Sequence, residues 1–172
     1  MVPRSSATAA TVLVALVVAC EAPRFEGGEL RNVGLPLYPR FVATFGPLPL
    51  DQPGEFSFIF RRFPSAHAGV VLETPSRPDA QALEILTTRV ELSVTDQAGA
   101  VRCSGTGSPA SDEPYRLVVW SNSGEARGLW HSGCSGVDVS LCEPCTLHVK
   151  VSGIDPRAPT LAVVPALHGR KE

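Results

Sequence analysis

The sequence predicts an all-β protein that folds as one antiparallel β-sandwich, immunoglobulin-like or jelly-roll-like, with about eight or nine strands and little helix. Three observations support this class. The chain of 172 residues is 44% hydrophobic, which suits a single domain with a closed core. It contains 15 Gly and 16 Pro, which is typical of many turns. Apolar residues recur at every second position in several segments, as they do in half-buried strands.

The charge balance limits the classes of partner. The chain has 15 basic and 17 acidic residues, so it lacks the basic field with which proteins hold nucleic acid. We therefore expect no nucleic-acid partner. The Gly-rich segment 104–109 lacks the Lys of a phosphate loop, so we interpret it as a flexible connection and expect no cofactor.

The first twenty residues have the organisation of an export signal. Arg4 supplies a positive charge, residues 5–19 are uncharged, and residues 11–19 form an apolar run. The uncharged run is shorter than the ~20 residues of a membrane-spanning helix. The motif Val-Val-Ala-Cys at residues 17–20 resembles the lipobox of bacterial lipoproteins.

That resemblance implies that residues 1–19 are removed as a signal peptide and that Cys20 is acylated. The thiol would carry diacylglycerol, and the new amino group a fatty acid such as palmitate. These acyl chains would fix the exported protein to a lipid bilayer, which is the expected partner. In bacterial lipoproteins an Asp directly after the acylated Cys favours retention in the inner membrane. This chain has Glu21 at that position, so the resemblance implies the outer membrane, on its periplasmic or its surface face.

The mature chain divides into a tether and a domain. Residues 20–39 are rich in Pro, Gly and charge and show no sustained period, so we expect a lipidated tether there. Residues 40–172 contain no second boundary and no internal repeat. We expect them to form the single β-sandwich domain.

The strands of this domain follow from alternating apolar residues separated by turn-forming sequences such as 51–54 and 96–99. The expected strands span residues 41–45, 56–60, 86–95, 100–103, 116–120, 137–141, 147–151 and 161–164. The clearest is 86–95, where apolar and polar residues alternate over the full length. His148 and Lys150 are expected to point outward. The last strand is expected to end at Pro165, because proline has no N–H to donate to a sheet.

Five cysteines become four if Cys20 carries lipid. Cys103 follows one expected strand, and Cys134, Cys142 and Cys145 cluster around another. An even number in an exported chain predicts two disulfides, for which three pairings are possible. We favour Cys103 with Cys134 and Cys142 with Cys145.

The same region allows an alternative chemistry. His131 and Cys134, with Cys142 and Cys145, have the paired spacing of a tetrahedral zinc site. Cys142 and Cys145 also form a C-x-x-C motif, which is typical of thiol-redox proteins when it begins a helix. Here the motif leads into an expected strand, so disulfides remain the favoured interpretation and metal binding or redox chemistry the alternative.

The remaining candidates for chemistry have simpler explanations. Trp120, Trp130 and Tyr115 suggest a sugar-binding face, but the two Trp residues adjoin apolar segments, so we favour core packing. The other polar candidates are scattered and are interpreted as solvated surface residues: His67, His131, His148, His168, Asp112 with Glu113, Asp138 with Glu143, and Arg61, Arg62 and Arg77. We therefore expect no enzyme but a binding, adhesion or structural module of the cell envelope, with an unidentified protein or glycan ligand.

Overall fold

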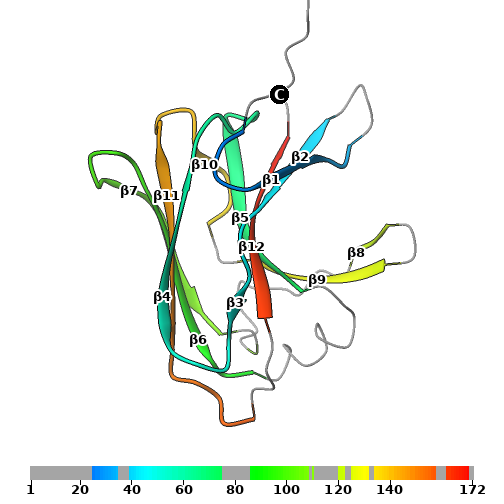
Figure 1. The fold of residues 1–172 in the computed structure, drawn as a ribbon, viewed down its shortest axis with the longest axis vertical. Helices are drawn as coiled ribbons and strands as arrows, with labels where there is room; N and C mark the ends of the chain where they lie inside the picture. The colour runs from blue at the N-terminus through cyan, green and yellow to red at the C-terminus, as the bar shows by residue number, and fades with distance from the viewer. Residues whose placement is uncertain are drawn as a thin grey trace, which may run out of the picture.

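A computed structural model describes much of the chain from Phe25 onward (Figure 1). The described residues are 25–34, 39–74, 86–108, 110, 120–122, 125–131, 134–157 and 162–170, with only the backbone described for 74, 120–122, 125–131, 162 and 170. Within these ranges the chain forms antiparallel strands and no helix. The strands make two packed sheets, so the predicted antiparallel β-sandwich is confirmed.

The larger sheet has the strand order β1-β2-β12-β5-β9-β8, with β3 also paired to β12 and β10 to β5. Its strands are β1 (Glu29–Asn32), β2 (Arg40–Thr44), β3 (Leu48–Pro49), β5 (His67–Thr74), β8 (Trp120–Asn122), β9 (Glu125–His131), β10 (Val137–Asp138) and β12 (Ala162–Arg170). The long strands β5 and β12 lie next to each other in its middle, where β12 also contacts β2.

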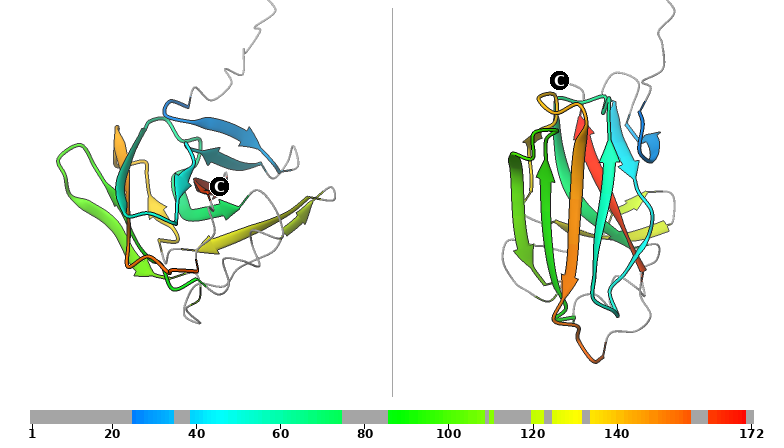
Figure 2. Two further views of the ribbon diagram at one scale, coloured as in Figure 1. Left: turned by 60° about the horizontal axis from the view of Figure 1, so that its bottom comes forward. Right: turned by 60° about the vertical axis from the view of Figure 1, so that its left-hand side comes forward.

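The smaller sheet has the order β4-β11-β6-β7, and its strands run side by side along the molecule (Figure 2). Its strands are β4 (Gly54–Phe60), β6 (Arg89–Thr95), β7 (Val101–Gly107) and β11 (Cys145–Ser152). The described residues therefore form twelve strand segments, two of them only two residues long, which is more than the eight or nine expected.

The core lies between the two sheets. Alternate residues of β6, from Val90 to Val94, are at most 2% exposed, and so are Leu147 and Val149 of β11. They pack against β5, whose Val70 is 1% exposed. The predicted faces of these strands are thus confirmed, and His148 and Lys150 point outward. Each such side chain contributes about 1.5–3 kcal/mol by leaving water.

Part of the segment expected to be a tether is a strand. Residues 29–32 form β1, which pairs with β2 from Glu29 opposite Thr44 to Asn32 opposite Phe41. Further upstream, the ring of Phe25 lies 6.0 Å from that of Phe63, centroid to centroid. Apolar packing and strand pairing therefore hold the described part of segment 20–39 against the domain.

Pro165 does not end the last strand, because β12 continues through it to Arg170. Before Pro165, β12 pairs with β3, and after it with β2. The Pro165 carbonyl accepts a hydrogen bond of 3.0 Å from the Phe45 N–H, on the side where these two partners meet. In a strand the N–H and the carbonyl of one residue point to the same side, so the ring nitrogen of Pro165 also faces the place between the two pairings. No strand there requires an N–H from this residue, so β12 tolerates the proline.

Other expectations also need correction. Segment 104–107 is not a flexible connection but the second half of β7. The strand expected at 137–141 ends at Asp138, and Leu141 is 63% exposed because the chain turns after Val139. Strands β5 and β9 were not expected. Most of the strand expected at 116–120 lies outside the described residues.

Candidate functional site

One disulfide joins the two sheets. Cys103 of β7 belongs to the smaller sheet, and Cys134 lies just before β10, where its carbonyl accepts a 2.8 Å hydrogen bond from Val70 N–H of β5. The Cα atoms of the two cysteines are 5.7 Å apart, and their separation in sequence is 31 residues. The bond therefore closes a long loop and fixes β7 to the larger sheet.

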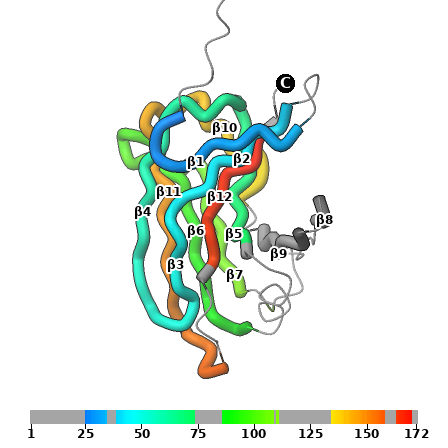
Figure 3. The backbone as a smooth tube through the Cα atoms, turned by 45° about the vertical axis from the view of Figure 1, so that its right-hand side comes forward, coloured from blue at the N-terminus to red at the C-terminus, as the bar shows by residue number. Residues whose placement is uncertain are grey.

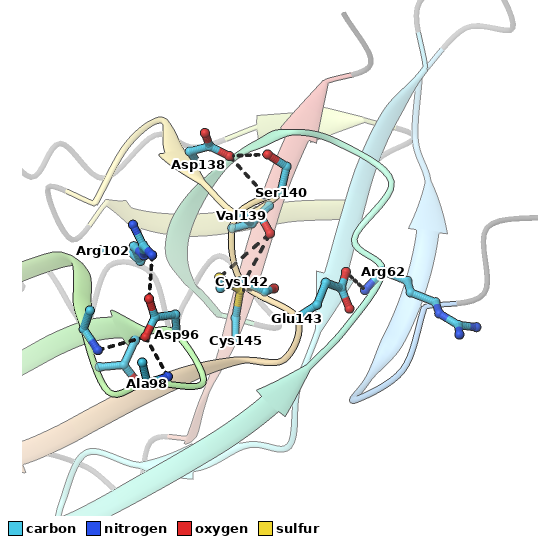
Figure 4. Close-up of a disulfide and its surroundings, with 12 residues drawn as sticks. Arg62, Asp96, Ala98, Arg102, Asp138, Val139, Ser140, Cys142, Glu143 and Cys145 are labelled. Carbon is cyan, nitrogen blue, oxygen red and sulfur yellow. Dashed lines mark hydrogen bonds and ion pairs between the residues drawn. A yellow bond between two sulfur atoms is a disulfide. The ribbon is translucent and has the colours of Figure 1, made fainter.

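The second disulfide, Cys142–Cys145, closes the loop between β10 and β11, with its Cα atoms 5.0 Å apart (Figure 4). Both cysteines are at most 2% exposed. The loop is held from outside by Glu143, whose Oε1 accepts the Arg62 N–H at 2.9 Å. Both disulfides have the pairing that the sequence analysis favoured.

The alternative metal ligands are not gathered into one site by the described residues. Cys134 is bonded to Cys103, while Cys142 and Cys145 are bonded to each other, so none of them offers a thiolate. The side chain of His131 lies outside the described residues. Within the described part of the chain, no group of three or more His, Cys, Asp or Glu side chains is arranged to hold a metal ion.

The candidate site is a hollow of about 620 Å³ on the outer face of the smaller sheet. We call it the sheet hollow. It is lined from all four strands by polar side chains that point away from the core: Glu55, Ser57, Arg89, Glu91, Ser93, Ser104, Thr106, His148 and Lys150. These polar residues share one face because side chains alternate along each strand, and the residues between them point inward and fill the core.

The centre of the sheet hollow is one row of side chains across the four strands. Strand register places Ser57 opposite His148, His148 opposite Ser93, and Ser93 opposite Ser104. The imidazole of His148 joins two hydroxyls, with Nδ1 3.0 Å from Ser57 Oγ and Nε2 3.1 Å from Thr95 Oγ1. Among the described residues, the hydroxyls of Ser93 and Ser104 have no hydrogen-bond partner and face solvent.

The next two rows of the sheet hollow together carry balanced charge, with Lys150 in the first and Arg89 in the second. Lys150 lies opposite Glu55 on one side and Glu91 on the other, with Nζ 3.4 Å from Glu55 Oε1. Arg89 Nε lies 3.2 Å from Glu91 Oε1. These pairs are exposed and contribute little to stability. Because each of these cations has a carboxylate beside it, the two rows favour a polar ligand without a large net charge.

The sheet hollow contains one hydroxyl beside an imidazole. Ser57 contacts an imidazole, but the other ring nitrogen of His148 contacts the hydroxyl of Thr95 and not a carboxylate. Among the described residues, no carboxylate contacts the ring to orient it or to stabilise the imidazolium that forms when a general base takes a proton. The described residues of the hollow are therefore equipped for hydrogen bonding to a bound molecule.

The other sequence candidates are not brought together. Asp138 accepts hydrogen bonds from the Ser140 hydroxyl and N–H, which together hold the pKa of Asp138 below its ordinary value, while Glu143 faces Arg62 (Figure 4). His168 Nε2 lies 2.8 Å from Glu73 Oε1 on the outer face of the larger sheet. The remaining candidates, Tyr115, Asp112, Glu113, Arg77 and the Trp120 and Trp130 side chains, lie outside the described residues.

A buried acid supports the fold at the far end of the sandwich. Asp155, in the loop between β11 and β12, is 2% exposed and accepts hydrogen bonds from the Arg157 guanidinium at 2.8 and 3.0 Å. It also accepts the N–H and hydroxyl of Thr87, each at 3.0 Å. Hydrogen bonding from Arg157, and then from Thr87, holds the pKa of Asp155 well below its ordinary value despite burial.

Sequence reasoning missed Ser57, Ser93 and Ser104 as site residues. Their signal in the sequence is weak, because an outward serine in an alternating strand is an ordinary surface residue.

Comparisons with protein-family models, with curated proteins and with solved structures found no match. In the part of the chain that the structure describes, no helix is long and apolar enough to cross a membrane.

Proposed function

We propose that the chain is an exported lipoprotein, anchored through acylated Cys20, whose β-sandwich binds a ligand in the sheet hollow without chemical conversion. The observation that carries the binding role is the hollow itself. Its volume of about 620 Å³ falls within the range of sites that hold small ligands or short segments, roughly 300–1,000 Å³. Its lining of hydroxyls, imidazole and paired charges suits a polar stretch of a glycan or a protein.

The disulfides support the export part of the proposal. The structure has disulfides between Cys103 and Cys134 and between Cys142 and Cys145. Disulfides persist in oxidising compartments and are rare in cytosolic proteins. They also favour a binding module over the alternative metal or thiol-redox protein, because they engage the cysteines on which that alternative depends. The lipobox at residues 17–20 supports the anchor, on the outer membrane as the favoured location.

The anchor is tested by changing the acylated residue. Cys20→Ala should abolish fatty-acid labelling of the protein and release it from the membrane fraction or leave it unprocessed. Mass spectrometry of the N-terminal peptide gives the direct measurement. Unchanged processing and unchanged membrane fractionation in the variant would refute the lipoprotein proposal.

The binding role is tested by filling the sheet hollow. Ser93→Arg places a long cation in its central row, whereas Gln97→Arg adds the same side chain at an exposed turn outside it. Thermal unfolding is measured with soluble envelope glycans, glycan fragments and peptides, because a bound ligand raises Tm by mass action. A ligand should raise the Tm of the wild type and of Gln97→Arg but not that of Ser93→Arg. Equal shifts in all three proteins would place the binding site elsewhere.

A further inference from the structure

The exposed apolar side chains gather at one end of the sandwich. Among the described residues four large apolar side chains are exposed: Val33, Ile59, Val101 and Leu141, at 51%, 58%, 61% and 63%. Ile59 lies near the end of β4 and Val101 at the start of β7, in one row across the smaller sheet. Leu141 is in the loop before β11, and Val33 follows β1. We call this end, which lies uppermost in Figure 1, the apolar end.

The N-terminal segment reaches the domain at the same end. Phe25 packs on Phe63, and Glu26 pairs through its backbone with Arg61, so the chain is held there from its first described residue (Figure 3). Only four residues separate Cys20 from Phe25. Even a fully extended chain spans about 18 Å over that distance. A lipid on Cys20 therefore keeps the apolar end close to the bilayer surface.

The apolar end also offers cations to the lipid phosphates. Arg40 and Arg61 are exposed there, and no carboxylate among the described residues pairs with either. The acids at this end have other partners: Asp96 pairs with Arg102, and Glu26 lies 3.8 Å from Arg62. Glu143 accepts the backbone N–H of Arg62, and Asp138 accepts the N–H and hydroxyl of Ser140. Apolar side chains beside long cationic ones are typical of surfaces that lie in the membrane interface. The opposite end has no exposed large apolar residue in its described part.

We propose that the apolar end rests on the phospholipid bilayer, with Ile59, Val101 and Leu141 in the interfacial region and Arg40 and Arg61 at the headgroup phosphates. This inference depends on the lipid anchor of the proposed function and adds the orientation of the domain. The strands of the smaller sheet then rise from the membrane. The sheet hollow opens sideways above it and remains accessible to a ligand.

Hydroxyl-radical footprinting tests this orientation, because it measures the solvent exposure of individual side chains. The acylated mature protein is placed in vesicles of phosphatidylethanolamine and phosphatidylglycerol, and the reference is the full mature chain with Cys20→Ser in solution. Oxidation of Ile59, Val101 and Leu141 should fall several-fold on vesicles. Oxidation of Pro156, exposed at the opposite end, should not change.

Polar substitutions provide the second measurement. In Val101→Thr with Leu141→Gln, the protein stays in the vesicles through its acyl chains, but Ile59 should regain its oxidation. Pro156→Gln, the matched change at the other end, should leave the protection of Ile59 intact. Both sets of substitutions are at exposed positions, and unchanged protection of the buried strands reports an intact fold.

The outcomes separate this inference from the proposed function. An acylated, vesicle-bound protein whose apolar end is oxidised as in solution would overturn the orientation but not the anchor. Protection that grows with protein density in the membrane would indicate contact between copies of the chain and would also overturn it. A chain that carries no lipid on Cys20 would refute the proposed function on which the orientation rests.

Discussion

The inter-sheet disulfide should contribute more to stability than the local one. Replacing Cys103 and Cys134 by Ala removes a cross-link over 31 residues, whereas replacing Cys142 and Cys145 removes one over 3. In the chain-entropy relation the cross-link lowers the entropy of the unfolded chain with the logarithm of loop length. It gives about 3.7 kcal/mol for the long loop and about 1.6 kcal/mol for the short one.

The two double variants are matched controls for each other, since each changes two Cys to Ala. Cys142 and Cys145 are both at most 2% exposed, while Cys103 is only half-buried. Loss of buried contacts alone would therefore make the local pair the costlier one. Loop closure predicts the reverse order, with a difference of about 2 kcal/mol.

Urea unfolding followed by tryptophan fluorescence and far-UV circular dichroism gives the free energy of unfolding in water for each protein. In a thermal scan, loss of the Cys103–Cys134 bond should lower Tm by about 10 °C. An equal loss in both variants, or a larger loss in Cys142→Ala with Cys145→Ala, would refute loop closure as the main source of the stabilisation.

Three further changes test the packing and electrostatics. Leu147→Ala empties a fully buried position in β11 and should cost about 2–5 kcal/mol in urea unfolding, against less than about 1 kcal/mol for the outward neighbour His148→Ala. Gly27→Ala would press a Cβ against the Ile59 carbonyl oxygen, closer than van der Waals radii allow, and should cost about 1–3 kcal/mol by the same measurement. The folded pKa of Asp155 lies below the unfolded value, so its stabilisation is present above about pH 4 and lost as pH falls below it. Asp155→Asn should therefore be less stable at neutral pH and lose less stability between pH 5 and pH 2, which urea midpoints at several pH values measure.

Strand alternation predicted the elements that have one face in the core and one in solvent. In β6 and β11 successive side chains point to opposite faces, so the sequence pattern directly gives the buried set. The outward positions of His148 and Lys150 follow from the same rule. The fold class could be predicted because this rule depends only on neighbouring residues along the chain.

The central strand β5 of the larger sheet escaped prediction for the converse reason. In β5 the core-facing Val70 and Leu72 are buried, but so is Val71 on the other face, beside Ala166 of β12. Burial on both faces removes the alternation that marks a strand. Pro165 also misled the prediction. The strand tolerates a residue without an N–H at this position because β2 and β3 meet beside it, and the sequence alone does not show which strands are neighbours.

The sequence by itself determined the class of fold, the turn-rich composition, the signal-like first segment with its Cys20, and which side chains of the regular strands point outward. Only the tertiary structure decided which outward side chains share a site. The row from Ser57 through His148 and Ser93 to Ser104 exists because β11 lies between β4 and β6, and β7 beside β6. Side-chain direction is fixed locally by the backbone, whereas strand neighbours are chosen by the packing of a whole core, to which every segment of the chain contributes.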